Sequence, residues 1–237
     1  MANVLFPTAG AQKIQNIWNT SHALADEGAY FIATNPTPLT PIAITAAIVD
    51  AANAGATSAQ TRPVSVIYNP WAVNDPAAKA IYLQYWWFLL TTIPATGNVF
   101  DMCMWLDPVG SNTYSSGGSK IVPVAANPGI GSASRAQFYF GAITANPTTA
   151  GGQLIMRRKI DSVIPVVLDE YMLTFGDVSM PTNVLSAGTV VKRVNFPLPP
   201  VVIPPGFALK LGMFGTGNTG TPAFEFECGY VERQPGL

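Results

Sequence analysis

Charged side chains are scarce in this sequence. They make up 11% of the 237 residues, whereas soluble domains usually carry about 25%. Lys and Arg together number 12 and Asp and Glu 13, so the sequence predicts no basic surface for nucleic acid or an anionic membrane. A surface so poor in charge is hard to solvate, which predicts that neighbouring subunits cover part of it. A monomer surfaced by Ser, Thr and Asn is the alternative.

Side chains suited to catalysis and metal binding are equally rare. His22 is the single histidine, and Cys103 and Cys228 are the two cysteines. Zinc sites need several such ligands at short spacing, and a catalytic triad needs a histidine beside its nucleophile. Both cysteines lie within apolar runs, which predicts buried free thiols. The sequence therefore predicts no enzyme activity, no metal and no cofactor.

Long apolar segments and targeting signals are also missing. The first ten residues, MANVLFPTAG, lack the basic start and the apolar core of a signal peptide. The longest apolar run, Ile81 to Leu90, contains Gln84 and falls short of the ~20 residues that a membrane helix needs. We expect a soluble protein that is made in a cytoplasm and has no membrane partner.

Strand-like alternation is what the chain does contain, and it is clearest in residues 199–233. Apolar side chains recur at every second position in two runs, Phe207–Met213 and Phe224–Tyr230, as they do along a strand with one buried face. The segment GTGNTGTP between the runs has glycines suited to a reversal. We predict a β-hairpin here, with Lys210 opposite Glu227.

Short strand-like runs separated by Gly- and Pro-rich turns fill much of the remaining chain. Lys79–Thr92 is the most β-prone of them, and Val99–Leu106 is expected beside it. Asp107–Ser119 is expected to be a polar surface loop. About ten to twelve short strands and no long helix predict an all-β fold, an antiparallel jelly-roll β-sandwich. We expect this domain to span residues 28–237, with residues 1–27 as a short N-terminal arm or helix.

The N-terminal segment allows two interpretations. Helical spacing in its second half favours a short helix folded back onto the domain, and its apolar start favours an arm that docks on a partner as an added strand. In either case its apolar side chains are candidate contacts to another subunit or to a capsid. These residues are Val4, Leu5, Phe6, Ile14, Ile17 and Trp18.

Two groups of charges interrupt the apolar pattern. Arg157, Arg158 and Lys159 form the one basic cluster, and strand alternation separates Arg158 from the other two. We interpret the cluster as a solvated strand or as a contact to an acidic partner. Glu225 and Glu227 are the candidates for a glycosidase pair. They lie two residues apart on one strand face with Lys210 expected opposite, which suits a charge-paired surface better.

Tryptophans mark a further candidate surface. Trp86 and Trp87 are consecutive in one strand-like run, so they must face opposite ways, and at least one of them is predicted to be core. Trp71, Trp87 and Trp105 are candidates for a glycan-stacking platform or for interface anchors, because large aromatic rings favour both uses. Burial of both Trp86 and Trp87 in the core, on the two sides of their strand, is the alternative.

Two segments carry a family resemblance. ALADEGAYFIATNPTPLT (residues 23–40) and PPVVIPPGFALKLGMF…FEFECGYVER (residues 199–214 and 224–233) resemble virion proteins of tailed bacteriophages. They are similar to jelly-roll capsid decoration or cement proteins, and the same features occur in tumour-necrosis-factor-like trimers. The resemblance implies a homotrimer on the capsid exterior without enzyme activity. It also implies contacts with the major capsid protein or another virion protein, and location in a virion assembled in the host bacterial cytoplasm.

Three functions follow from these observations. The first is a trimeric decoration protein that stabilises capsomer contacts, favoured by the low charge and the β-rich pattern. The second is a carbohydrate- or receptor-binding head domain of a phage tail fibre or spike, which would use Trp71, Trp87 or Trp105. The third, a hydrolase, rests only on Glu225 and Glu227.

Overall fold

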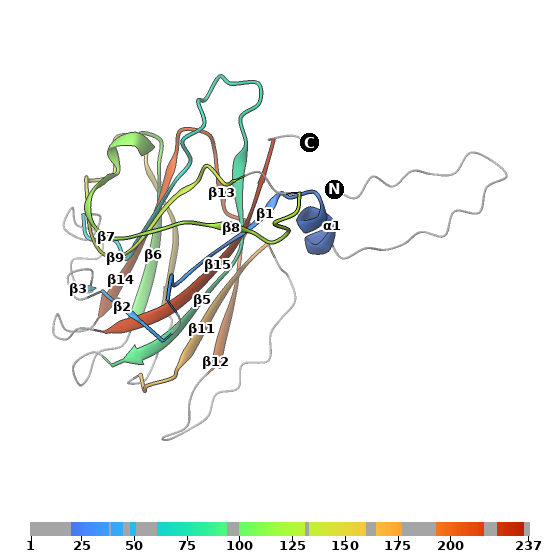
Figure 1. Cartoon of the computed structure of the whole chain (residues 1–237). Coiled ribbons are helices and arrows are strands. Elements are labelled where there is room, and N and C mark those ends of the chain that lie inside the picture. Colours follow the sequence, from blue (N-terminus) through green and yellow to red (C-terminus); the bar gives the residue numbers. More distant parts are fainter. Residues whose placement is uncertain are drawn as a thin grey trace.

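The chain folds into two β-sheets packed face to face (Figure 1). The computed structural model describes residues 20–37, 39–44, 48–50, 61–93, 100–130, 133–159, 165–176, 193–215 and 222–234. Nearly all regular structure within these ranges is strand, which confirms the predicted all-β sandwich. The jelly-roll connectivity stays a prediction.

Sheet A is the larger of the two sheets. Its eight described strands are β1 Tyr30–Thr34, β2 Ile42–Ala43, β5 Ala80–Thr92, β8 Val124–Ala125, β11 Glu170–Phe175, β12 Arg193–Leu198, β13 Val202–Ile203 and β15 Ala223–Arg233. The order across the sheet is β12, β11, β5, β15, β1, β8, while β13 pairs with β5 and β2 with β15. All described pairs in it are antiparallel except β11 with β12.

Sheet B faces sheet A across the core. Its seven described strands are β3 Ile48–Asp50, β4 Ser65–Tyr68, β6 Phe100–Asp107, β7 Tyr114–Ile121, β9 Gln137–Ala145, β10 Gln153–Lys159 and β14 Ala208–Gly215. Their order is β10, β6, β14, β4, β9, β7, and β3 pairs in parallel with β14. A short helix, α1 Thr20–Asp26, precedes β1, and a single 3-10 turn, η2 Gly110–Asn112, precedes β7. No helix in the described ranges is long and apolar enough to cross a membrane.

Aromatic rings from both sheets meet in the core. Phe226 of β15 stacks on Phe140 of β9 with ring centroids 4.0 Å apart, and it also stacks on Phe138 at 5.7 Å. Trp86 of β5 packs against Phe138 at 5.7 Å and against Phe88 at 5.5 Å. All five side chains are fully buried. Offset and tilted rings at these distances add to the free energy of simple area burial, so this cluster joins the two sheets.

The predicted C-terminal hairpin is wrong. Both runs are strands with buried apolar faces, but β14 lies in sheet B and β15 in sheet A. β14 pairs with β6 and β4, whereas β15 pairs with β5 and β1. The residues between them therefore join opposite layers, and Lys210 does not lie opposite Glu227. Burial of both apolar faces against each other across the core outweighs direct pairing of the two strands.

Two further predictions, one of neighbouring strands and one of a surface loop, differ from the structure. Lys79–Thr92 and Val99–Leu106 were expected to be neighbours, yet they form β5 in sheet A and β6 in sheet B. The expected polar loop Asp107–Ser119 contains η2 and most of β7. β7 is polar because six of its residues are exposed at the edge of sheet B, and edge strands tolerate such a composition.

Candidate functional site: the outer face of sheet A

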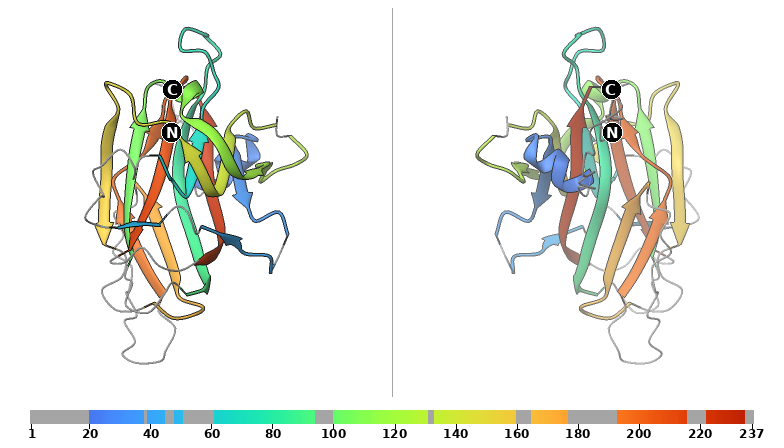
Figure 2. Two further views of the ribbon diagram at one scale, coloured as in Figure 1. Left: turned by 90° about the vertical axis from the view of Figure 1, so that its left-hand side faces the viewer. Right: turned by 90° about the vertical axis from the view of Figure 1, so that its right-hand side faces the viewer.

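Sheet A has an outer side that points away from sheet B (Figure 2, right). The residues on this side are mainly aromatic, apolar and acidic. Phe224, Phe226 and Cys228 of β15 are buried in the core, so the residues between them point outward. Three rows of paired residues cross this outer side, which we call the sheet A face. They are Glu225, Leu89, Glu170, Arg193; Thr34, Glu227, Trp87, Met172, Asn195; and Ile32, Gly229, Tyr85, Thr174, Pro197.

Two tyrosines lie over Gly229 on the sheet A face. A Cβ at this position would lie 2.2 Å from Tyr85 Cε1 and 2.7 Å from the Tyr30 hydroxyl oxygen, so glycine leaves the space that both side chains occupy. The Tyr85 hydroxyl donates a hydrogen bond to Glu227 Oε1. Burial, with the nearby Cys228 and Glu227, raises the pKa of Tyr30 to about 12. Burial and the bond to Glu227 also raise the pKa of Tyr85, so both phenols are hydrogen-bond donors at neutral pH.

The centre of the sheet A face is aromatic and apolar, with carboxylates on either side. Trp87 is half-buried and lies between Glu227 of β15 and Met172 of β11. Leu89 lies between Glu225 and Glu170 in the same manner. Such a surface suits a flat partner that offers apolar groups together with cations or hydroxyls. Among the residues that the structure describes, no three His, Cys, Asp or Glu side chains are placed to hold a metal ion.

An apolar rim borders one end of sheet A. Its members are Leu39, Ile93, Val167 and Leu168, which are 87%, 46%, 47% and 51% exposed. Leu168 N–H donates to Leu90 O at the end of β5, and Ile93 directly follows β5. Leu39 and Leu168 have backbone φ angles of 61° and 74°, a region that non-glycine residues rarely adopt. Two leucines thus combine an unfavourable backbone with an exposed apolar side chain, as in sites that bind partners.

A second surface with exposed apolar and charged side chains is β10, at the edge of sheet B. Six of its seven residues are exposed, and only Met156 is buried. Leu154 and Ile155 follow Gln153 at the start of the strand, and Arg157, Arg158 and Lys159 end it. A groove of about 160 Å³ lies beside it. The groove is lined by Leu106, Ile155, Met156, Leu198, Pro199, Pro200, Val201 and Val202.

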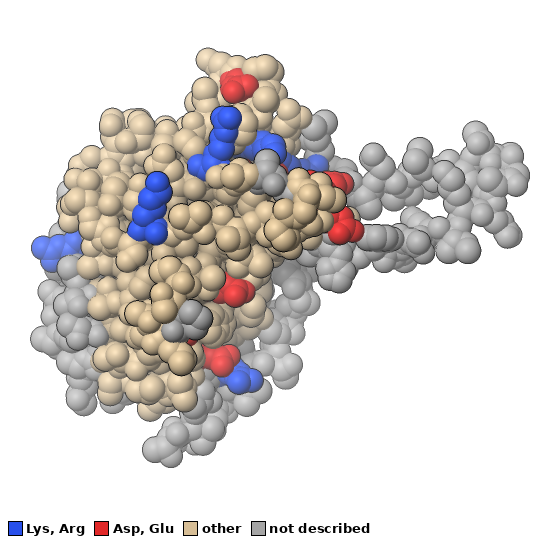
Figure 3. Space-filling model, viewed as in Figure 1, with Lys and Arg blue, Asp and Glu red and all other residues tan. Residues whose placement is uncertain are grey.

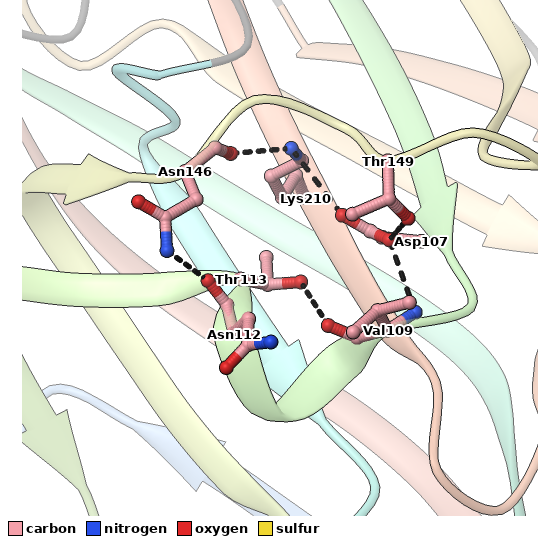
Figure 4. A network of polar contacts seen from close by, with 7 residues as sticks. All are labelled: Asp107, Val109, Asn112, Thr113, Asn146, Thr149 and Lys210. Atoms are coloured by element: carbon pink, nitrogen blue, oxygen red, sulfur yellow. Dashed lines mark hydrogen bonds and ion pairs between the residues drawn. The ribbon is translucent and has the colours of Figure 1, made fainter.

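A buried ion pair lies on the outer side of sheet B (Figure 4). Lys210 Nζ is 3.9 Å from Asp107 Oδ2 and donates to Asn146 O at 3.0 Å. Asp107 Oδ1 accepts from Val109 N–H at 3.1 Å and from Thr149 Oγ1 at 2.7 Å. Burial lowers the pKa of Lys210 to about 8, although Asp107 opposes this shift. The network joins β6, β14 and the segment after β9, and the side chains of Lys210 and Asp107 at its centre are shielded from solvent, so we assign it a structural role.

The three candidate tryptophans lie in three different places. Trp87 is on the sheet A face, as a stacking or anchoring role requires. Trp105 of β6 is 3% exposed, so its ring offers no face to a ligand, and the sequence-based prediction is wrong for this residue. Trp71 follows β4 and lies under Arg135, whose guanidinium carbon is 4.0 Å from the ring centroid. The three rings therefore form no common platform.

Other predicted residues fall into three groups. Arg157 and Arg158 are exposed on β10. Glu225 and Glu227 share the sheet A face, where Glu227 accepts the hydrogen bond of Tyr85. Val4, Leu5, Phe6, Ile14, Ile17 and Trp18 lie outside the described residues.

The two cysteines are buried free thiols, as predicted. Burial raises the pKa of Cys103 to about 11, and it also raises the pKa of Cys228. Because the thiolate is the reactive form, both thiols are poor nucleophiles at neutral pH.

Sequence analysis missed Tyr30 and Met172 on the sheet A face and both leucines of the apolar rim. The sequence does contain the signal for Tyr30 and Met172. Each of them directly precedes a core residue of its strand, Phe31 or Leu173, so its side chain must point outward. Nothing in the sequence signals a positive φ at a leucine. No protein-family model, curated protein or solved structure matches the chain.

Proposed function

We propose that the protein is a structural virion subunit, a homotrimeric decoration or cement protein that binds the capsid exterior and stabilises contacts between capsomers. The observation that carries this proposal is the sheet A face, a flat surface whose centre is formed by Tyr85, Trp87, Leu89 and Met172. Half-buried aromatic and apolar residues of this kind are typical of protein interfaces. The low charge of the surface agrees with this proposal, since uncharged residues predominate on the side of the molecule that Figure 3 shows.

The apolar rim supplies a second contact surface in this proposal. Leu39 and Leu168 protrude at the end of sheet A, and a decoration protein needs one surface for its own copies and another for the shell. Standard protein contacts bury roughly 1,200–2,000 Å², and many symmetric copies add their contributions. The predicted N-terminal arm, with Val4, Leu5 and Phe6, belongs to the same proposal as an interlocking element.

Two measurements test the proposal. Light scattering after size-exclusion chromatography should give a mass three times that of the chain. Particles assembled without this protein should bind it on their exterior in electron micrographs and should resist heat better afterwards. A monomer that does not bind such particles would contradict the proposal.

A carbohydrate- or receptor-binding head domain is the second candidate, and Trp87 favours it. Its ring lies beside Glu227 and near Tyr85, and sugars are commonly bound by an aromatic ring next to hydrogen-bonding side chains. A glycan array with the wild type and the Trp87→Ala variant separates the two candidates. Binding that is lost in Trp87→Ala and kept in Trp71→Ala would favour the head domain.

A further inference from the structure

The β10 edge carries more cations than anions, although Asp101 of β6 lies opposite Lys159. The sheet A face carries more anions than cations, although Arg193 pairs with Glu170 there at 3.3 Å. Arg157, Arg158 and Lys159 are exposed at the end of β10, which has β6 as its one neighbour among the described strands of sheet B. Glu225 and Glu227 point outward from β15 on the sheet A face. Complementary charge steers association and favours one partner surface over another.

The spacing of the charges also matches. Arg157 and Lys159 lie two residues apart, so they point to the same side of β10 and are separated by roughly 7 Å along it. Glu225 and Glu227 have the same separation along β15 for the same reason. Two parallel ion pairs can therefore form without distortion of either strand.

Apolar groups accompany the charges on both surfaces. Leu154 and Ile155 of β10 are 56% and 36% exposed, and they precede the cations. Leu89 and Trp87 pair directly with Glu225 and Glu227. Ion pairs beside an apolar contact are partly shielded from solvent, so they are less weakened by salt than isolated surface pairs.

These two surfaces cannot meet within one chain. β10 lies at the edge of sheet B (yellow, Figure 2, left), whereas the sheet A face points away from sheet B. We propose that the β10 edge of one copy binds the sheet A face of the next copy. This contact is head-to-tail, so it generates a closed ring or an open filament. The inference rests on the self-assembly part of the proposed function and adds which surfaces meet.

Charge reversal tests the contact. The edge variant is Arg157→Glu/Lys159→Glu, and the face variant is Glu225→Lys/Glu227→Lys. Each places like charges in the contact, which should raise the dissociation constant of the assembly at least about a hundredfold. A chain carrying all four changes should assemble again, because its charges are complementary once more. Lys120→Glu, an exposed reversal on β7, is the matched control and should assemble as the wild type does.

A mixture of the two variants reports the ring size. Edge and face variants are complementary only when they alternate, so the mixture closes rings with an even number of copies and cannot close a trimer. Wild-type protein that is monomeric would overturn the inference, and so would edge or face variants that assemble normally. Failure of the fourfold variant to assemble, with an intact fold by circular dichroism, would overturn it as well. Shell binding is measured separately, so an assembled protein that binds no shell contradicts the decoration function alone.

Discussion

Lys210 of β14 and Asp107 of β6 form an ion pair, 3.9 Å from Nζ to Oδ2, in which both side chains are shielded from solvent. Removing two charges from water is costly, and their attraction offsets that cost only when additional hydrogen bonds satisfy them. Asn146 supplies such a bond to Lys210, and Val109 and Thr149 supply bonds to Asp107. The pair therefore depends on all three neighbouring groups.

Removing one charge of the Lys210–Asp107 pair should lower the free energy of unfolding more than removing both charges. We expect Lys210→Met to lower the free energy of unfolding by about 3–5 kcal/mol, because Asp107 would stay buried without its cation. In Lys210→Met/Asp107→Asn the amide oxygen still accepts from Val109 and Thr149, so the loss should be smaller by about 2 kcal/mol. Urea unfolding of the wild type and both variants measures these differences. A double variant as unstable as the single one would contradict the explanation.

The same pair gives stability a defined pH dependence. The pKa of Lys210 is about 8 in the folded chain and 10.5 as its ordinary value. Between these values the unfolded chain binds one more proton at this residue, so stability rises with pH. The stability of the wild type relative to Lys210→Met/Asp107→Asn should begin to rise as pH passes the folded pKa of about 8. It should then increase by up to about 1 kcal/mol per pH unit as pH approaches 10.

Equilibrium unfolding of both proteins from pH 7 to pH 10 measures this difference. The raised pKa values of the buried thiols and tyrosines weaken both proteins at high pH, and taking the difference removes that contribution. A difference that stays constant or falls across this range would contradict the lowered pKa of Lys210.

Alternation in the sequence predicted which side of each strand is apolar, but not which strand lies beside it. Phe224, Phe226 and Tyr230 are buried as the pattern requires, and so are Leu209 and Leu211. The apolar face of a strand is covered by the opposite sheet in either case, so the alternation does not reveal which strand is its hydrogen-bonded neighbour. The connection between β14 and β15 is compatible with both arrangements, so the pairing depends on contacts distant in sequence.

For the candidate site as well, the sequence predicted which way a strand residue faces but not whether that side of the sheet is covered. Trp87 was correctly expected to face away from Trp86, because consecutive strand residues point to opposite sides. Trp105 gave the same signal as Trp87, yet it is buried on the outer side of sheet B next to Lys210. That outer side carries a second apolar cluster, formed by Val66, Ile143, Ala145 and Ala208. Sequence patterns alone do not show that both sides of a sheet are covered.

Gly229 should tolerate no larger residue. A Cβ there would lie 2.2 Å from Tyr85 Cε1, so Gly229→Ala must displace Tyr85 and Tyr30 from the sheet A face. We expect a loss of about 1–3 kcal/mol of stability, as in other overpacked sites. Gly129→Ala is the control, because its nearest neighbour would be Asn127 at 3.5 Å. Thermal unfolding compares the two, and equal melting temperatures would contradict the close packing over Gly229.

Trp87 and Trp105 should respond oppositely to truncation. Trp105→Ala should destabilise the fold by about 3–5 kcal/mol, because it removes a buried aromatic ring. Trp87→Ala should cost less than about 2 kcal/mol, because the ring is partly solvated, but it should prevent self-assembly. Chemical denaturation and light scattering together separate the two effects. Normal assembly of Trp87→Ala would show that the sheet A face is not part of the self-assembly interface.

Leu168 combines backbone strain with an exposed apolar side chain, and substitution can separate the two. Its φ of 74° costs a leucine roughly 1–2 kcal/mol, whereas asparagine adopts this region more readily. We therefore expect Leu168→Asn to raise the free energy of unfolding by up to about 1 kcal/mol, while binding to the shell weakens. Leu168→Ala keeps the strain and loses the side chain, so it should weaken shell binding without the gain in stability. If both variants bind the shell as the wild type does, the strained leucine has no role in attachment, and the apolar rim is not the shell contact.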